Sequence, residues 1–134
     1  METTQRRTLL LALLLCSFVS QTLYLNVAVL LPVFVHDNFP GMSSFLVGLL
    51  MAIYPIAYLF AAPFIGQKLI SFGRKNAVTT GIILMTISTV IFGLGGYAQN
   101  VYAFFWVSFA ARLLQGIGDA IMGVSIQSII AIEF

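Results

Sequence analysis

Two charged residues and an amide stand in an otherwise apolar stretch near the end of the sequence. Arg112, Gln115, Gly116 and Asp119 are spaced i, i+3, i+4 and i+7, so a helix would place them on one face. The opposite face would carry leucine and isoleucine. The stretch is apolar enough to cross a membrane, where a charge against lipid tails costs at least about 2.5–3.5 kcal/mol. The polar face must therefore look into protein or into a water-filled cavity.

Arg112 and Asp119 are the residues of this face that can do chemistry. A helix rises about 1.5 Å per residue, so the two side chains stand roughly 10 Å apart along its axis and need separate partners. Burial favours a protonated acid, whereas a nearby arginine favours the carboxylate. This competition suits reversible proton binding, and we expect Arg112, Asp119 and Gln115 to lie on a proton or substrate pathway. The alternative is that the two charges only fix helix packing.

The composition indicates an integral membrane protein. Of the 134 residues 60% are hydrophobic and only 7% are charged, whereas a soluble domain carries about 25% charged residues. A bilayer core about 30 Å thick requires roughly 20 apolar helical residues. Four stretches meet this requirement, at residues 8–35, 44–65, 76–97 and 102–132. We predict an all-α fold of four transmembrane helices, and the first stretch is too long for a signal peptide.

The basic residues predict the orientation of these helices. Cytoplasmic segments are enriched in Lys and Arg, and here such residues flank the first stretch or lie between the second and third: Arg6, Arg7, Lys68, Arg74 and Lys75. We therefore expect the N-terminus, the loop 66–75 and the C-terminus to be cytoplasmic. The net charge of +2 reflects this topology, so the lipid bilayer is an expected partner and nucleic acid is not.

Other polar and small residues complete the predicted site. Gln21 lies in the first stretch, and Tyr54 and Tyr58 lie one turn apart in the second. We assign them to the same pathway, although each could equally satisfy a neighbouring helix. Gly116, Gly118 and Ala120 predict close helix packing. With one histidine, one cysteine and no nucleophile–base set, the sequence predicts no enzyme activity, no metal site and no cofactor.

The connection between the second and third stretches resembles a motif of the major facilitator superfamily. In that family this cytoplasmic loop reads G-x-L-a-D-r-x-G-R-R/K, and here it reads "GQKLISFGRK". Gly66, Gly73, Arg74 and Lys75 match, and the resemblance implies that they form a conformational gating loop. Lys68 stands where leucine is usual, and Ile70 replaces the aspartate that latches a neighbouring helix in the family.

The fourth stretch is similar to a second motif of the family, R-x-x-Q-G-x-G-x-A, in the form "RLLQGIGDA". In antiporters of the family the arginine takes part in proton coupling. The resemblance therefore implies that Arg112 tunes the protonation of a nearby acid, for which Asp119 is the local candidate. It also implies transport of a small solute by alternating access.

Within the superfamily the chain looks most like drug:proton antiporters of the vesicular amine and polyamine transporter branch. Residues 26–35, "NVAVLLPVFV", resemble the end of the first helix there, which suggests an organic cation or polyamine as substrate. That branch places an acid in the first helix where this chain has Ser20. The resemblance spans about the first third of a twelve-helix transporter, so we expect a fragment whose partners are the missing C-terminal helices.

Two other interpretations remain open. A complete four-helix protein could act as a dimeric multidrug:proton antiporter of the small type, but that family needs a glutamate in the first helix, where this chain has no acid. A non-transporting membrane scaffold or assembly subunit would use Arg112 and Asp119 as packing or docking charges.

Overall fold

The computed structural model describes residues 3–134, which form four long helices. They are α1 (Thr3–Asn38), α2 (Ser44–Phe72), α3 (Arg74–Gly95) and α4 (Val101–Glu133). Each is long and apolar enough to cross a membrane. The predicted all-α fold with four membrane-length helices is confirmed.

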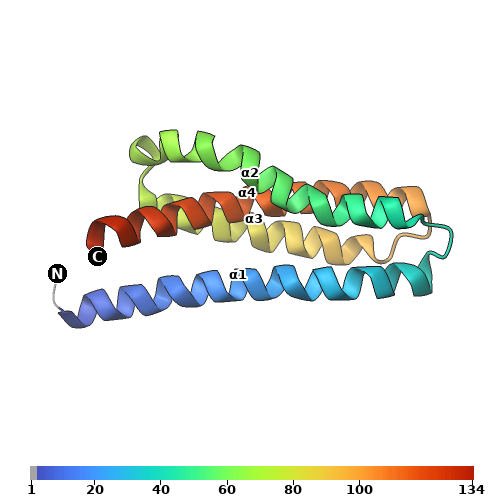
Figure 1. The fold of residues 1–134 in the computed structure, drawn as a ribbon, viewed down its shortest axis with the longest axis horizontal. Helices are drawn as coiled ribbons and strands as arrows, with labels where there is room; N and C mark the ends of the chain where they lie inside the picture. The colour runs from blue at the N-terminus through green and yellow to red at the C-terminus, as the bar shows by residue number, and fades with distance from the viewer. Residues whose placement is uncertain (1–2) are drawn as a thin grey trace.

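The helices run antiparallel to one another in chain order (Figure 1). Both termini and the α2–α3 turn lie at one end of the bundle, and the other two connections lie at the opposite end. α4 is the central helix: it packs along α2 and α3 and makes a shorter contact with α1. The polar face predicted from the sequence therefore lies on the most buried element of the fold.

The end of α2 differs from the sequence expectation. The predicted loop 66–75 is largely helical, because α2 continues to Phe72, and Gly73 alone separates it from α3. Gly73 has φ 89° and its N–H donates to the carbonyl of Leu69 at 3.0 Å. This conformation is accessible to glycine and strained for other residues. The other predicted helix ends lie within five residues of the observed ones.

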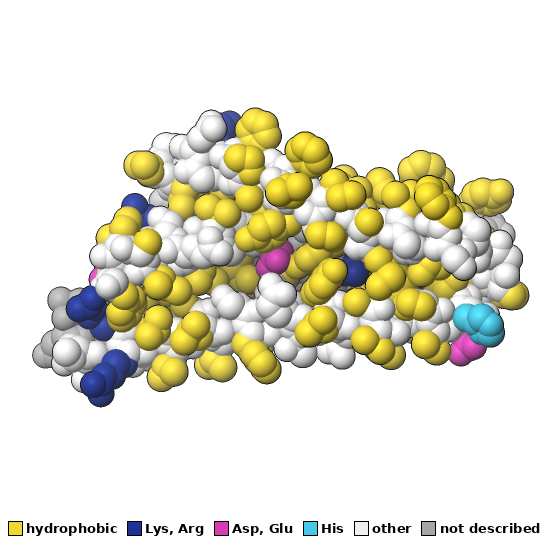
Figure 2. Space-filling model, viewed as in Figure 1, with side chains coloured by type: hydrophobic (Ala, Val, Ile, Leu, Met, Phe, Trp, Pro, Cys, Tyr) yellow, Lys and Arg dark blue, Asp and Glu magenta, His cyan; other side chains and the backbone are white. Residues whose placement is uncertain are grey.

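Two apolar clusters frame the middle of the bundle. One lies toward the α1–α2 connection and includes Leu31, Leu50 and Phe104. The other lies toward the termini and includes Leu13 and Met122. Large apolar side chains cover much of the outer surface, whereas basic side chains gather at the end that carries the termini (Figure 2). Such a surface suits a lipid environment, and the polar residues of α4 lie between the two clusters.

Candidate functional site

The carboxylate of Asp119 joins three helices. Its Oδ1 accepts a hydrogen bond from Ser20 Oγ of α1 at 2.5 Å, and its Oδ2 accepts one from Tyr54 Oη of α2 at 2.7 Å. Only 5% of Asp119 is exposed. A charged acceptor makes hydrogen bonds roughly twice as strong as those of a neutral one. Asp119 is therefore the polar centre at which α1 and α2 attach to α4.

Arg112 is completely buried two turns from Asp119. Its Nη1 donates to Gln115 Oε1 at 3.0 Å, and Gln115 Nε2 donates to Thr89 Oγ1 of α3 at 3.4 Å. Its Nε and Nη2 have no hydrogen-bond partner within residues 3–134. A buried guanidinium with two unpartnered donor nitrogens is rare, and these nitrogens make Arg112 the least satisfied polar group of the site.

Three aromatic rings surround the Arg112 guanidinium. Its central carbon lies 5.8 Å from the ring centre of Tyr24, 5.3 Å from that of Tyr54 and 5.6 Å from that of Phe92. Tyr24 and Tyr54 also stack on each other at 4.7 Å. Ring faces attract cations, more strongly where water is excluded. These rings, together with Gln115, stabilise the cation in the absence of a paired carboxylate.

Arg112 and Asp119 do not form a salt bridge. Among the described residues the ion-pair contact is between His36 and Asp37, at the end of α1 far from this site. Tyr54 connects the two charges, because its ring lies against Arg112 while its hydroxyl binds Asp119. A change in the charge of Asp119 can therefore be transmitted to Arg112 through one side chain.

Asp119 also borders a polar cavity of about 210 Å³ between α1, α2 and α4. Other polar residues lining it are Ser17, Gln21, Tyr58 and Gln127. Liquid water occupies about 30 Å³ per molecule, so the cavity has room for several waters or a small polar group. The predicted residues Asp119, Gln21 and Tyr58 thus share one cavity, whereas Arg112 and Gln115 lie outside its lining. Gln21 is exposed and Tyr58 is half-buried.

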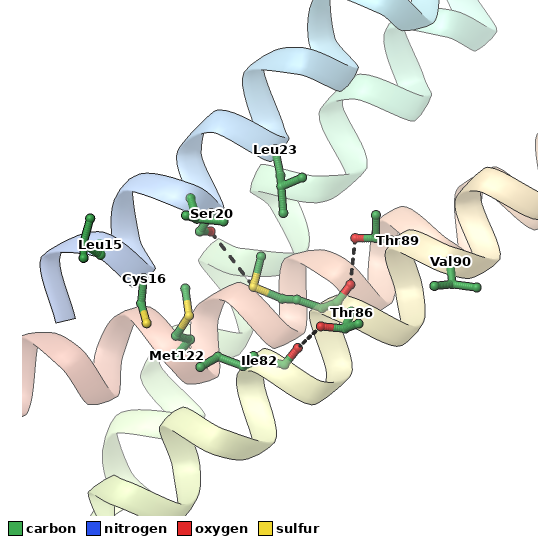
Figure 3. Close-up of a pocket in the computed structure, with 11 residues that line it drawn as sticks. Leu15, Cys16, Ser20, Leu23, Ile82, Thr86, Thr89, Val90 and Met122 are labelled. Carbon is green, nitrogen blue, oxygen red and sulfur yellow. Dashed lines mark hydrogen bonds between the residues drawn. The ribbon is translucent and has the colours of Figure 1, made fainter. Parts of the chain in front are cut away.

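A larger hollow of about 410 Å³ lies between α1 and α3 (Figure 3). Its walls are mostly apolar, with Leu23, Ile82 and Val90 among them. Ser20 points into this space from α1, and its hydroxyl lies 4.0 Å from the sulfur of Met85. Ser20 and Met122 line both this hollow and the polar cavity, so these two side chains lie between the apolar hollow and the cavity that Asp119 borders.

The residues of the predicted gating loop have different surroundings. Gly66 lies inside α2, where an added Cβ would meet only Val124 at 4.0 Å, so sterics do not require glycine there. Arg74 Nε donates to Ser128 Oγ at 2.9 Å and ties the start of α3 to the end of α4. Lys75 is exposed.

The predicted packing residues of α4 lie at close helix contacts. A Cβ on Gly116 would collide with the carbonyl oxygen of Tyr54 and lie 2.9 Å from Ala57 Cβ. A Cβ on Gly118 would lie 3.0 Å from the Met85 side chain. Ala120 is fully buried. Gly116 thus allows α2 to approach α4 at the level where Tyr54 reaches Asp119.

Four residues of the site are not among the predicted pathway residues: Ser20, Tyr24, Thr89 and Phe92. The resemblance does point to Ser20, as the position where the vesicular amine branch has an acid. The sequence favours Gln21, but its neighbour Ser20 makes the contact with Asp119. Tyr24 shares a helical face with Gln21 at i+3, and this spacing places it beside a predicted pathway residue. Thr89 and Phe92 carry no comparable signal, because a lone hydroxyl or ring in a membrane helix is common.

Comparison with known proteins identifies related sequences. The family model described as Major Facilitator Superfamily matches residues 13–132. Multidrug resistance protein 2 of Bacillus subtilis (strain 168) is 27% identical over 95% of this chain and 30% of its own length. Multidrug resistance protein 1 of the same strain is 28% identical over 67% of this chain and 21% of its own length. The chain thus spans less than a third of these relatives. No solved structure matches it significantly.

Proposed function

The chain belongs to the major facilitator superfamily, and we propose that it supplies four helices of a larger proton-coupled carrier that works by alternating access. The family, the membrane-length helices and the multidrug resistance relatives support a multi-pass membrane protein of small-solute transport. Proton coupling is the finer part of the proposal, and it rests on Asp119.

The observation that carries proton coupling is the position of the Asp119 carboxylate. It is buried, it borders a polar cavity, and it accepts hydrogen bonds from Ser20 and Tyr54. Protonation would remove its negative charge and occupy one acceptor site with a proton. Both bonds would then lose their charge assistance, and the attachment of α1 and α2 to α4 would weaken. Proton binding is thereby linked to the relative positions of three helices.

Arg112 is the second charged group of the proposed cycle. It lies two turns from Asp119 on α4, and Tyr54 contacts both groups. The unused Nε and Nη2 donors of Arg112 would bind a carboxylate, a carbonyl or water when helices rearrange. Arg112 therefore acts as the fixed positive charge against which the proton is loaded and released.

An organic cation is the substrate class that this proposal favours. The polar cavity contains one carboxylate, two amides and two kinds of hydroxyl, and no basic residue of the described chain lines it. A cation would bind the Asp119 carboxylate once the proton has left. Proton movement and cation movement across the membrane would then be coupled in opposite directions. The names of the two multidrug resistance relatives support a drug as the small solute. Within the organic-cation class, the amine and polyamine branch is a proposal based on the resemblance of residues 26–35.

The proposed topology places both termini in the cytoplasm. The end of the bundle that carries the termini also carries Lys68, Arg74 and Lys75 next to the α2–α3 turn. Basic residues on the connections at one end favour the cytoplasmic side for that end. The connections at the opposite end, residues 39–43 and 96–100, contain no Lys or Arg. This difference between the two ends supports an outward-facing position for both of these connections.

Substitution of Asp119 by Asn tests the proton role. The native gene product is purified and reconstituted into liposomes. Proton flux is then followed with a pH-sensitive dye on addition of ethidium or spermidine. We expect cation-dependent proton flux in the parent protein and at least a roughly 100-fold loss in Asp119→Asn, as for removal of a proton-transfer group. Glu133→Gln is the matched control, because Glu133 ends the same helix outside the cavity.

A packing role for Asp119 is the competing hypothesis, and one observation favours it: both carboxylate oxygens already have protein donors. Under that hypothesis Asp119→Asn reconstitutes poorly, and any protein that does insert retains the parental pH dependence of transport. Unchanged proton flux per inserted molecule in Asp119→Asn would remove Asp119 from the coupling mechanism.

A further inference from the structure

A groove of about 460 Å³ runs between the last turns of α2 and the first turns of α3. Phe64 and Phe72 of α2, Ala77 of α3 and Ile121 of α4 line it with apolar surface. Lys68 and Ser71 are the polar side chains that α2 contributes to the lining. The volume falls within the range of small-molecule binding pockets. The groove and the Asp119 cavity have no lining residue in common.

The groove lies where the hydrocarbon core meets the headgroup region. α2 has 29 residues, about 43 Å at 1.5 Å per residue, and exceeds the roughly 30 Å core of a bilayer. Lys68 is the one charged residue of α2 and lies in its last turns, so the excess length extends these turns to headgroup depth. Lys68 lies in these last turns, and Phe64 lies one turn nearer the middle of the membrane. The groove thus has a charged part at headgroup depth and an apolar part at the depth of acyl chains.

The charge at this end of the bundle favours an anion. Lys68 is exposed and forms no salt bridge within residues 3–134, where the ion-pair contact is His36–Asp37 at the other end. Further basic residues, Arg74 and Lys75, follow the adjacent turn. Figure 2 shows basic side chains gathered at this end. Basic clusters at membrane surfaces attract anionic lipids.

We propose that this groove binds an anionic phospholipid of the surrounding membrane. The Lys68 ammonium contacts the phosphate, and the Ser71 hydroxyl, which donates to the Lys68 carbonyl at 3.0 Å, has acceptor capacity left for a headgroup hydroxyl. One acyl chain lies along Phe64 and Ile121, which line the groove nearer the middle of the membrane than Lys68. A zwitterionic lipid has the same acyl chains but no net charge, so the site distinguishes lipids by their headgroups.

Native mass spectrometry of the native gene product, purified in detergent, tests this site. The protein is titrated with phosphatidylglycerol or with phosphatidylcholine of identical acyl chains. We expect a preference for phosphatidylglycerol of about fivefold, the fold-change that one basic residue near a membrane surface provides. Lys68→Gln should abolish this preference. Lys75→Gln is the matched control: it removes the same charge at the same end from a residue outside the groove lining, and it should retain the preference.

A second variant tests the apolar part of the groove. Thr80 is exposed and lines the groove from α3, so Thr80→Phe fills the space without altering charge or the buried core. It should weaken binding of both lipids. Equal losses in Lys68→Gln and Lys75→Gln would mean diffuse attraction without a site and overturn the proposal. Retention of neither lipid would indicate a groove covered by protein and would also overturn the proposal. Unchanged binding of both lipids by Thr80→Phe would overturn it as well.

Discussion

The contact between α2 and α4 at Gly116 permits a quantitative test of how the site is held together. In the substitution Gly116→Ala the added methyl group meets the Tyr54 carbonyl oxygen and comes within 2.9 Å of Ala57 Cβ. Carbon atoms pack best at about 3.5–4.0 Å, so the methyl group is roughly 0.6 Å too close to Ala57. The Tyr54 carbonyl belongs to the backbone and cannot rotate away. The two helices must therefore separate at the level of the Tyr54–Asp119 hydrogen bond.

Two opposing effects determine the size of the change. Overpacking of a well-packed contact costs about 1–3 kcal/mol. Replacement of glycine by alanine inside a helix contributes about 0.5–1 kcal/mol in the other direction. Gly48→Ala isolates the second effect, because Gly48 is also helical and an added Cβ there meets nothing within 4 Å. We therefore expect Gly116→Ala to be less stable than Gly48→Ala by about 1–3 kcal/mol.

Reversible unfolding in mixed lipid–detergent micelles with increasing dodecyl sulfate measures this difference. The single tryptophan, Trp106, packs against Phe105 and Phe109 with ring centres 5.5 and 6.0 Å apart, so its fluorescence reports unfolding of α4. The Tyr54–Asp119 bond should be weakened in the same variant, with a fall in proton flux. Equal stability of Gly116→Ala and Gly48→Ala would refute the close approach of α2 and α4 on which the site geometry depends.

Two further substitutions can be tested in the same unfolding assay. Gly73→Ala places a side chain at φ 89° and should destabilise the chain by about 1–3 kcal/mol. Its control, Gly41→Ala, lies at a connection with open space around it and should be near neutral. Equal effects of the two substitutions would contradict the strained turn. Tyr54→Phe should show a coupling energy with Asp119→Asn of about 0.6–1.7 kcal/mol in a double-mutant cycle, whereas Tyr58→Phe should show no coupling energy. Similar coupling energies for both tyrosines would contradict a specific hydrogen bond from Tyr54.

The helices and the polar face of α4 could be predicted because they depend on local properties. The length of an apolar run decides whether it can cross a bilayer, and a spacing of three and four residues decides which side chains share a face. Arg112, Gln115 and Asp119 are buried together for this reason. The end of α2 could not be predicted in the same way. The segment around Lys68 and Ser71 has the composition of a loop, but a helix can continue into the headgroup region, and here it ends only at Phe72, before Gly73.

The partners of Asp119 could not be predicted from the sequence. Ser20 is 99 residues and Tyr54 is 65 residues from Asp119 along the chain. Their contacts with Asp119 depend on the axial positions of α1 and α2 relative to α4. A change of one residue in that register exchanges Ser20 for Gln21, which lies about 100° further around the helix and is exposed. The aromatic surroundings of Arg112 depend on the same register, since Tyr24 and Phe92 come from two other helices.

The long separation between Ser20 and Asp119 has a consequence for biosynthesis. A ribosome adds about 5–20 residues per second, so the 99 residues between the two side chains correspond to roughly 5–20 s. During this time α1 must persist in the bilayer without its polar partner, and its sequence between Thr8 and Val35 is free of charged residues. The two intramembrane charges emerge only with α4, the last of the four helices. Their partners on α1, α2 and α3 are then already inserted, so Arg112 and Asp119 can enter a prepared environment instead of lipid.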